Sequence, residues 1–92
     1  MKVNEYYNGN VTSISFHGKD CPATTGVIAP GEYEFSTQQK EIMTVTSGVL
    51  EVQLHNETGY KSFSPYESFT VPAGEKFKVI AKNDVSYICL YY

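Results

Sequence analysis

The alternation of side chains between residues 41 and 54 constrains the fold of this chain more than any other feature. Every second residue there faces the same side of an extended backbone, and the pattern is interrupted only by a turn at Ser47-Gly48. The residues on the shared, mostly apolar sides are Glu41, Met43, Val45, Leu50, Val52 and Leu54. A period of two with one apolar face indicates antiparallel strands folded over a core.

The rest of the chain continues in short extended segments separated by turn residues. We expect strands at residues 11–16, 27–29, 32–37, 41–46, 49–54, 60–63, 68–71, 77–81 and 86–92. Residues 17–25 are expected to form a loop, because Gly18, Asp20 and Pro22 all interrupt regular structure. No segment of useful length shows a helical period. The sequence therefore predicts an all-β sandwich or small barrel.

Size and charge limit what this barrel can do. With 92 residues the chain is expected to form one domain over residues 1–92. Its net charge is −3, from seven basic residues (all lysine) and ten acids, which argues against nucleic-acid binding. No apolar run reaches about 20 residues, and the polar start leads us to expect no signal peptide. We expect a cytoplasmic protein without a membrane span, in which Cys21 and Cys89 are free thiols.

The last predicted strand, residues 86–92, is apolar on both faces. Tyr87, Cys89 and Tyr91 alternate with Ile88 and Leu90. A strand of this kind is covered on both sides, so we expect its second face to lie against a partner subunit in a homodimer.

Five segments of the chain, in order, resemble the bacterial pyrimidine/purine nucleoside phosphorylase family. They are NEYYNGNVTSISF, GVIAPGEYEFST, EIMTVTSGVLEV, FTVPAGEKF and SYICLYY, and the resemblance that they carry extends over essentially the whole chain. The resemblance implies a single-domain cupin, a jelly-roll-like barrel also called a double-stranded β-helix. It also implies phosphorolysis, in which inorganic phosphate displaces the base of a purine or pyrimidine nucleoside and leaves a pentose 1-phosphate.

The two cupin motifs are present in this chain without their metal-binding histidines. The first motif has a Glu, six residues and a Gly, which Glu41 and Gly48 match, but Thr37 and Gln39 stand where histidines are expected. The second motif, Pro-x-Gly-x-x-His, ends here in Phe77. A first-row metal needs several imidazole or thiolate ligands converging in one cavity. The resemblance therefore implies a barrel without metal or cofactor, with nucleosides and phosphate as its small-molecule partners.

The reaction implied by the family assigns a candidate role to several residues, and each has a structural alternative. Glu41, as the catalytic residue, would hold the ribose hydroxyls or stabilise the positive sugar, or else form an internal ion pair. Ser36 and Thr37 would bind phosphate, or would bond only to nearby backbone. Gln39 would read a base edge. The remaining substrate-binding candidates are Tyr33, Met43, Phe77 and Tyr87. They would pack against the base and the ribose, or would simply fill the core.

One departure weighs against catalysis. Phosphate sites commonly use arginine, which this chain lacks, and Leu90 stands where some relatives carry one. Lys76, Lys78 and Lys82 are expected to face outward. The rival hypothesis is therefore a non-catalytic cupin that binds a nucleoside or a sugar, and a metal-dependent cupin enzyme is a third possibility. The sequence does not rank one nucleoside above another.

Overall fold

The computed structural model describes residues 1–92, all of them in strands or in the turns between strands. Ten strands follow one another: β1 (Lys2–Tyr6), β2 (Val11–His17), β3 (Pro22–Ile28), β4 (Gly31–Ser36), β5 (Glu41–Ser47), β6 (Leu50–Gln53), β7 (Lys61–Phe63), β8 (Ser68–Val71), β9 (Lys76–Ala81) and β10 (Val85–Tyr91). The expected all-β architecture is confirmed. The chain contains no helix that could cross a bilayer.

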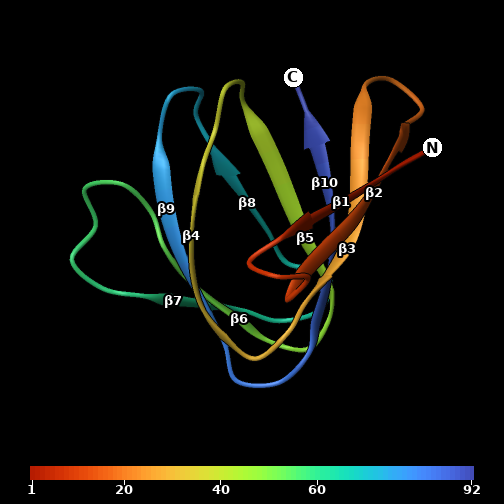
Figure 1. Ribbon diagram of the computed structural model, residues 1–92. Helices are drawn as coiled ribbons and strands as arrows, with labels where there is room; N and C mark the ends of the chain where they lie inside the picture. Colours follow the sequence, from red (N-terminus) through yellow and green to blue (C-terminus); the bar gives the residue numbers. More distant parts are fainter.

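The strands form two antiparallel sheets that face each other (Figure 1). The larger sheet has the order β1-β2-β3-β10-β5-β8, and the smaller has the order β4-β9-β6-β7. Consecutive strands often lie in different sheets, so the chain passes back and forth between the two layers. The turn from β5 to β6 needs Gly48, whose φ is 82° and where an added Cβ would lie 2.6 Å from the carbonyl oxygen of Asp84.

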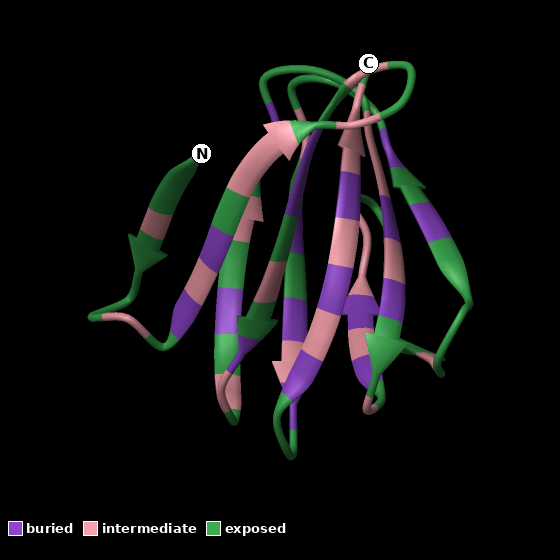
Figure 2. Cartoon of the chain, turned by 90° about the vertical axis from the view of Figure 1, so that its right-hand side faces the viewer, coloured by how far each residue is buried: buried purple, intermediate pink, exposed green.

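A single cluster of 15 buried apolar residues joins the inner faces of the two sheets. Val45 in the larger sheet and Leu50 and Val52 in the smaller sheet have no solvent exposure. The alternation read from residues 41–54 is confirmed here, because Met43 and Val45 on β5 and Leu50 and Val52 on β6 are buried and alternate with more exposed residues (Figure 2). Phe77, Val79 and Ala81 point inward as expected, and Lys76, Lys78 and Lys82 are exposed.

Two predictions about the N-terminal quarter are wrong. The polar segment at the start forms the edge strand β1, which pairs with β2 from Lys2 to Tyr6. The predicted loop at 17–25 is a loop only up to Cys21, because β3 begins at Pro22. Proline lacks an N–H group but is tolerated as the first residue of a strand, and the threonines that follow favour extended backbone. The breaker residues thus mark the end of the turn, and the strand starts directly after it.

The strand β10 lies at the centre of the larger sheet and contributes apolar residues to both of its faces. It pairs with β3 on one side and β5 on the other, and Tyr87 and Cys89 are buried against the core. The opposite face is uncharged around β10, and its central residues are Ile14, Phe16, Thr25, Ile42, Thr44, Ile88 and Leu90. Of these, Ile14 is 38% exposed, and nearby Val27 is 48% exposed. This outer face is the surface that the sequence assigns to a partner subunit, and the homodimer stays a prediction.

Substitution Leu90→Lys tests the dimer. If a second copy covers the outer face, a lysine at its centre leaves a charge in the contact, and sedimentation equilibrium should show the mass falling from two chains to one. Ile80→Lys is the matched control, because Ile80 is a partly buried residue on the outer face of the other sheet. A wild-type protein that sediments as one chain, or a Leu90→Lys protein that stays a dimer, would contradict the prediction.

Candidate active site

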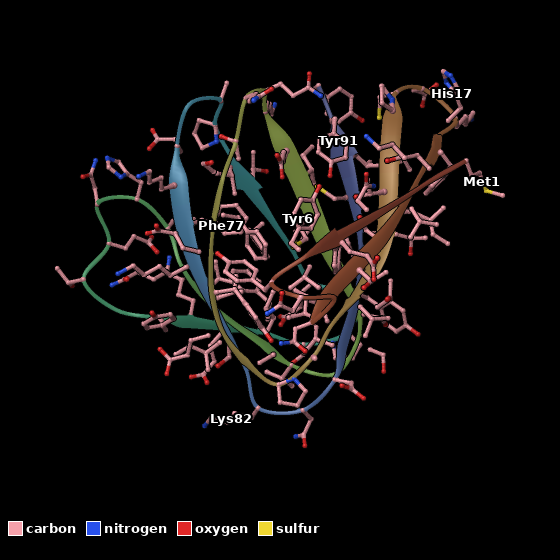
Figure 3. All side chains as sticks on the ribbon, in the orientation of Figure 1. Met1, Tyr6, His17, Phe77, Lys82 and Tyr91 are labelled. Carbon is pink, nitrogen blue, oxygen red and sulfur yellow. The ribbon has the colours of Figure 1, made fainter.

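A large cavity lies between the two sheets, at the end that the buried cluster leaves unfilled. Its volume is about 460 Å³, a size suited to a small metabolite. It is lined by Tyr6, Tyr7, Val11, Ser13, Ile28, Glu34, Phe35, Ser36, Glu41, Met43, Phe77, Tyr87 and Tyr91. Figure 3 shows Tyr6, Phe77 and Tyr91 reaching this interior from three different strands, whereas Met1, His17 and Lys82 lie at the periphery.

Glu41 is the only acid on the inner face of the larger sheet within this cavity, and it is partly buried. It opens β5, where its cross-strand partner on β10 is Tyr91. Burial raises the pKa of the Glu41 carboxyl, and a hydrogen bond from Cys89 partly offsets that rise. No ion pair involves Glu41, so the internal ion pair considered from the sequence does not form.

The groups beside Glu41 are neutral. The Cys89 thiol donates to Glu41 Oε1 at 3.5 Å, and burial raises the pKa of Cys89 to about 12, so the sulfur keeps its proton. Burial likewise raises the pKa of the Tyr87 phenol to about 12. The Tyr91 hydroxyl is hydrogen-bonded to Thr24 Oγ1 at 2.9 Å, which fixes the ring against β3. The carboxyl therefore meets a weak donor and aromatic rings, and no cation.

A glycine makes room for one of these rings. Gly26 on β3 is the cross-strand partner of Tyr87, and an added Cβ there would lie 2.9 Å from the Tyr87 hydroxyl. It would also meet the backbone of β2, at 2.6 Å from the carbonyl oxygen of Thr12. Any larger residue at position 26 would displace Tyr87, so this glycine sets the inner wall of the cavity.

The turn between β1 and β2 closes the cavity on the side of the smaller sheet. Tyr7 has a φ of 53°, a left-handed conformation that costs a tyrosine about 1 kcal/mol or more. Its hydroxyl donates to the Glu34 carbonyl oxygen at 2.6 Å and accepts from the Glu34 N–H at 3.3 Å. Its ring lies 5.1 Å from Tyr33 and 6.1 Å from Phe35. These contacts across the two sheets hold the strained turn over the cavity.

The structure brings five of the eight predicted site residues together in this cavity: Ser36, Glu41, Met43, Phe77 and Tyr87. They come from four strands in both sheets, so their convergence was not visible in the linear sequence. Ser36 ends β4 at the rim, and its hydroxyl makes no hydrogen bond to another residue. It is the polar group of the set that is best placed to meet a ligand.

The other three predicted residues do not line the cavity. The Thr37 hydroxyl, in a residue 5% exposed, donates to the Pro72 carbonyl oxygen at 2.6 Å and accepts from the Glu75 N–H at 3.1 Å. This is the structural alternative, a side chain that fastens the turn between β8 and β9. The Tyr33 hydroxyl donates to the carbonyl oxygen of Ala29 at 2.9 Å, and Gln39 is exposed in the turn before β5.

Sequence reasoning missed several lining residues, chiefly Tyr6, Tyr7, Phe35 and Tyr91. The first two lie before residue 11, where the sequence predicts no strand. Phe35 carried a usable signal, because it lies two residues after Tyr33 on the same face of β4. Tyr91 carried a usable signal, because it shares the inner face of the last strand with Tyr87 and Cys89.

The donor set does not fit the metal that the cupin motifs usually bind. Of the four motif positions, only Glu41 and Phe77 line the cavity, since Thr37 is committed to backbone and Gln39 is exposed. One carboxylate beside a phenylalanine lacks the converging ligands that a first-row metal requires. No three His, Cys, Asp or Glu side chains come together elsewhere in the chain.

The two facing antiparallel sheets, with a ligand-sized cavity between them, define the class of protein. A protein called EutQ from Clostridium difficile has the same fold, with a TM-score of 0.77 at 16% identity, covering 100% of this chain and 80% of that one. A Vibrio parahaemolyticus protein of unknown function superposes with a TM-score of 0.95 at 37% identity, covering 99% and 97%. The expected small cupin barrel is confirmed.

The sequence comparison identifies the family. The profile described as pyrimidine/purine nucleoside phosphorylase matches residues 1–91. A protein of that name from Pseudomonas putida strain F1 is 50% identical over 91 residues, covering 99% of this chain and 97% of its own length. The chain therefore belongs to the pyrimidine/purine nucleoside phosphorylase family, and the resemblance read from its sequence is confirmed.

Removing the Thr37 hydroxyl should cost stability. Thr37→Val keeps the shape of the side chain but leaves the Pro72 carbonyl and the Glu75 N–H without their partner, so we expect the free energy of unfolding in urea to fall by about 1–3 kcal/mol. Thr70→Val is the control, since Thr70 is exposed and should change the value by less than about 0.5 kcal/mol. Equal stabilities of the two variants would show that the Thr37 hydroxyl is not structural.

Glu41→Gln should be more stable than the wild type at neutral pH. Because burial raises the pKa of Glu41 in the folded chain, folding favours the protonated carboxyl, and wild-type stability falls as pH rises through that pKa. A neutral amide escapes this loss. The variant's advantage should therefore be absent at pH values below the unfolded carboxyl's pKa and grow above it, as followed by urea unfolding across pH. A constant difference would contradict the raised pKa.

Proposed function

We propose that this protein cleaves purine and pyrimidine nucleosides with inorganic phosphate, releasing free base and pentose 1-phosphate. The observation that carries the proposal is the family membership over residues 1–91, in which relatives about half identical to this chain bear the name of that activity. As a glycosyl-transferring enzyme it would need no cofactor beyond phosphate as co-substrate.

The cavity suits this reaction in its size and in its lining. A nucleoside fits a site of about 460 Å³, and π-faces accept purines and pyrimidines alike, which is consistent with broad base preference. Cleavage of the glycosidic bond puts positive charge on the pentose in the transition state. We propose that the Glu41 carboxylate in the cavity wall stabilises that charge, with Met43 beside it on β5 and Phe77 opposite on the smaller sheet.

Phosphate is the harder of the two substrates for this cavity to bind, because no basic side chain lines it. The nearest arrangement is at the rim, where Ser36 is the cross-strand partner of Lys76 on β9. We propose that phosphate enters on this side, with the Ser36 hydroxyl, neighbouring backbone N–H groups and Lys76 as its donors. The nucleoside would then lie deeper, between this rim and Glu41.

The rival function is nucleoside or sugar binding without turnover. The observation in its favour is again the absence of a basic group inside the cavity, since phosphorolysis requires a bound phosphate anion. A protein that only binds would be stabilised against heat by a nucleoside, through mass action, whether or not phosphate is present.

Incubation of the purified chain with uridine or inosine, with and without phosphate, separates the two functions. We expect free base to appear by liquid chromatography only when phosphate is present, with pentose 1-phosphate in equal amount. Glu41→Gln should lower kcat by about 100-fold with the fold retained, because the carboxylate acts on charge that develops in the transition state. Glu51→Gln, on the outer face of β6 near Lys82, is the control and should leave kcat unchanged.

Thermal stabilisation by nucleosides without release of base would support the binder and overturn the enzyme. Unchanged turnover in Glu41→Gln would remove that carboxyl from the chemistry while leaving the activity itself standing.

A further inference from the structure

The charges of the side chains that line the cavity indicate which charge its ligand should carry, a property that the family name does not specify. Its lining includes one partly buried carboxyl, Glu41, and no lysine or histidine, whereas Glu34 is exposed and alternates on β4 with the inward-facing Tyr33 and Phe35. The chain forms three ion pairs, His55–Glu75, Lys61–Glu57 and Lys82–Glu51, all at the surface. None of them neutralises a carboxylate of the cavity.

Six of the thirteen lining residues are aromatic, and several are in mutual contact. The ring centroids of Tyr7 and Phe35 are 6.1 Å apart, and those of Phe35 and Phe77 are 5.6 Å apart. They form a continuous wall on the side of the smaller sheet, facing Tyr87 and Glu41 on the larger sheet. The negative face of such rings attracts a cation within about 6 Å of the centroid, and more strongly where water is excluded.

Glu41 places a carboxylate in the cavity wall that no positive group of the protein pairs with. A partly buried carboxylate is costly unless it is paired, and its only hydrogen-bond donor within the protein is the neutral Cys89 thiol. A cation bound in the cavity would pair with this carboxylate and with the rings at the same time. An anion there would meet the Glu41 carboxylate without any compensating cation.

We infer that the cavity is selective for positive charge, and that its preferred occupant is a pentose-sized ring carrying a protonated amine. The proposed function supplies only the pentose frame, while the preference for charge follows from the lining. In phosphorolysis the same preference would act on the sugar as it becomes cationic and would favour that state over the neutral nucleoside.

A pair of ligands that differ only in charge tests the inference. One is a pyrrolidine ring bearing the hydroxyl groups of a pentose, which is protonated at neutral pH, and the other is the tetrahydrofuran ring with the same hydroxyls. Isothermal titration calorimetry on the full chain at low salt should show the pyrrolidinium binding at least about tenfold more tightly. In Glu41→Gln the ratio of the two affinities should fall toward one.

Glu51→Gln is the matched control, because it removes an equal charge from the outside of the smaller sheet and should keep the full ratio. Equal binding of the two rings to the wild type, binding of neither, or a ratio that survives Glu41→Gln would each overturn the inference. The outcome is separate from that of the proposed function. Phosphate-dependent base release with no preference for charge would leave the enzyme standing, and the preference without base release would leave the cation site standing.

Discussion

The pairing of β5 with β10 is the constraint on which the rest of the structure depends. It places two inward-facing rows side by side, with Glu41 opposite Tyr91, Met43 opposite Cys89 and Val45 opposite Tyr87. At the Val45 end the row meets aliphatic side chains of the smaller sheet and the interior is closed. At the Glu41 end the facing residues are rings and hydroxyls that leave space. One strand pair therefore belongs to the core at one end and to the cavity at the other.

A domain of this size gains little stability from burial, so maintaining an open cavity is costly. Aromatic residues reduce that cost because the same rings serve both regions. The Phe77 ring lies 6.0 Å from Phe69 in the core and 5.6 Å from Phe35 in the cavity wall, and it is 3% exposed. Tyr7 similarly fastens the N-terminal hairpin to β4 while its ring forms part of the wall. The open end of the barrel is thus held by contacts between large side chains and needs no additional element.

The sequence predicted the parts of the site that depend on strand periodicity. Alternation alone placed Glu41, Met43 and Phe77 inside, because the side-chain period of a strand persists in any antiparallel sheet. What it did not predict depends on contacts between distant strands. The role of Tyr7 requires a turn with left-handed backbone and a bond to β4, and the Thr37 hydroxyl is used by a turn 35 residues away in the chain. Neither contact leaves a periodic signal in the local sequence.

The same period of two also separates charge across β9. Phe77 and Val79 face the interior, while Lys76 and Lys78 stand on the opposite face of the same strand. Every lysine of the chain is exposed, and the only ionisable side chains near the buried end of the cavity are a carboxyl, a thiol and phenols. The lysines of the barrel therefore lie only outside and at its rim, and β9 separates Lys76 and Lys78 from the interior. An anion would meet lysine side chains only at the rim beside Ser36. A sugar that develops positive charge would meet the Glu41 carboxyl only inside the cavity. In the proposed reaction, phosphate would then attack from the rim toward the interior.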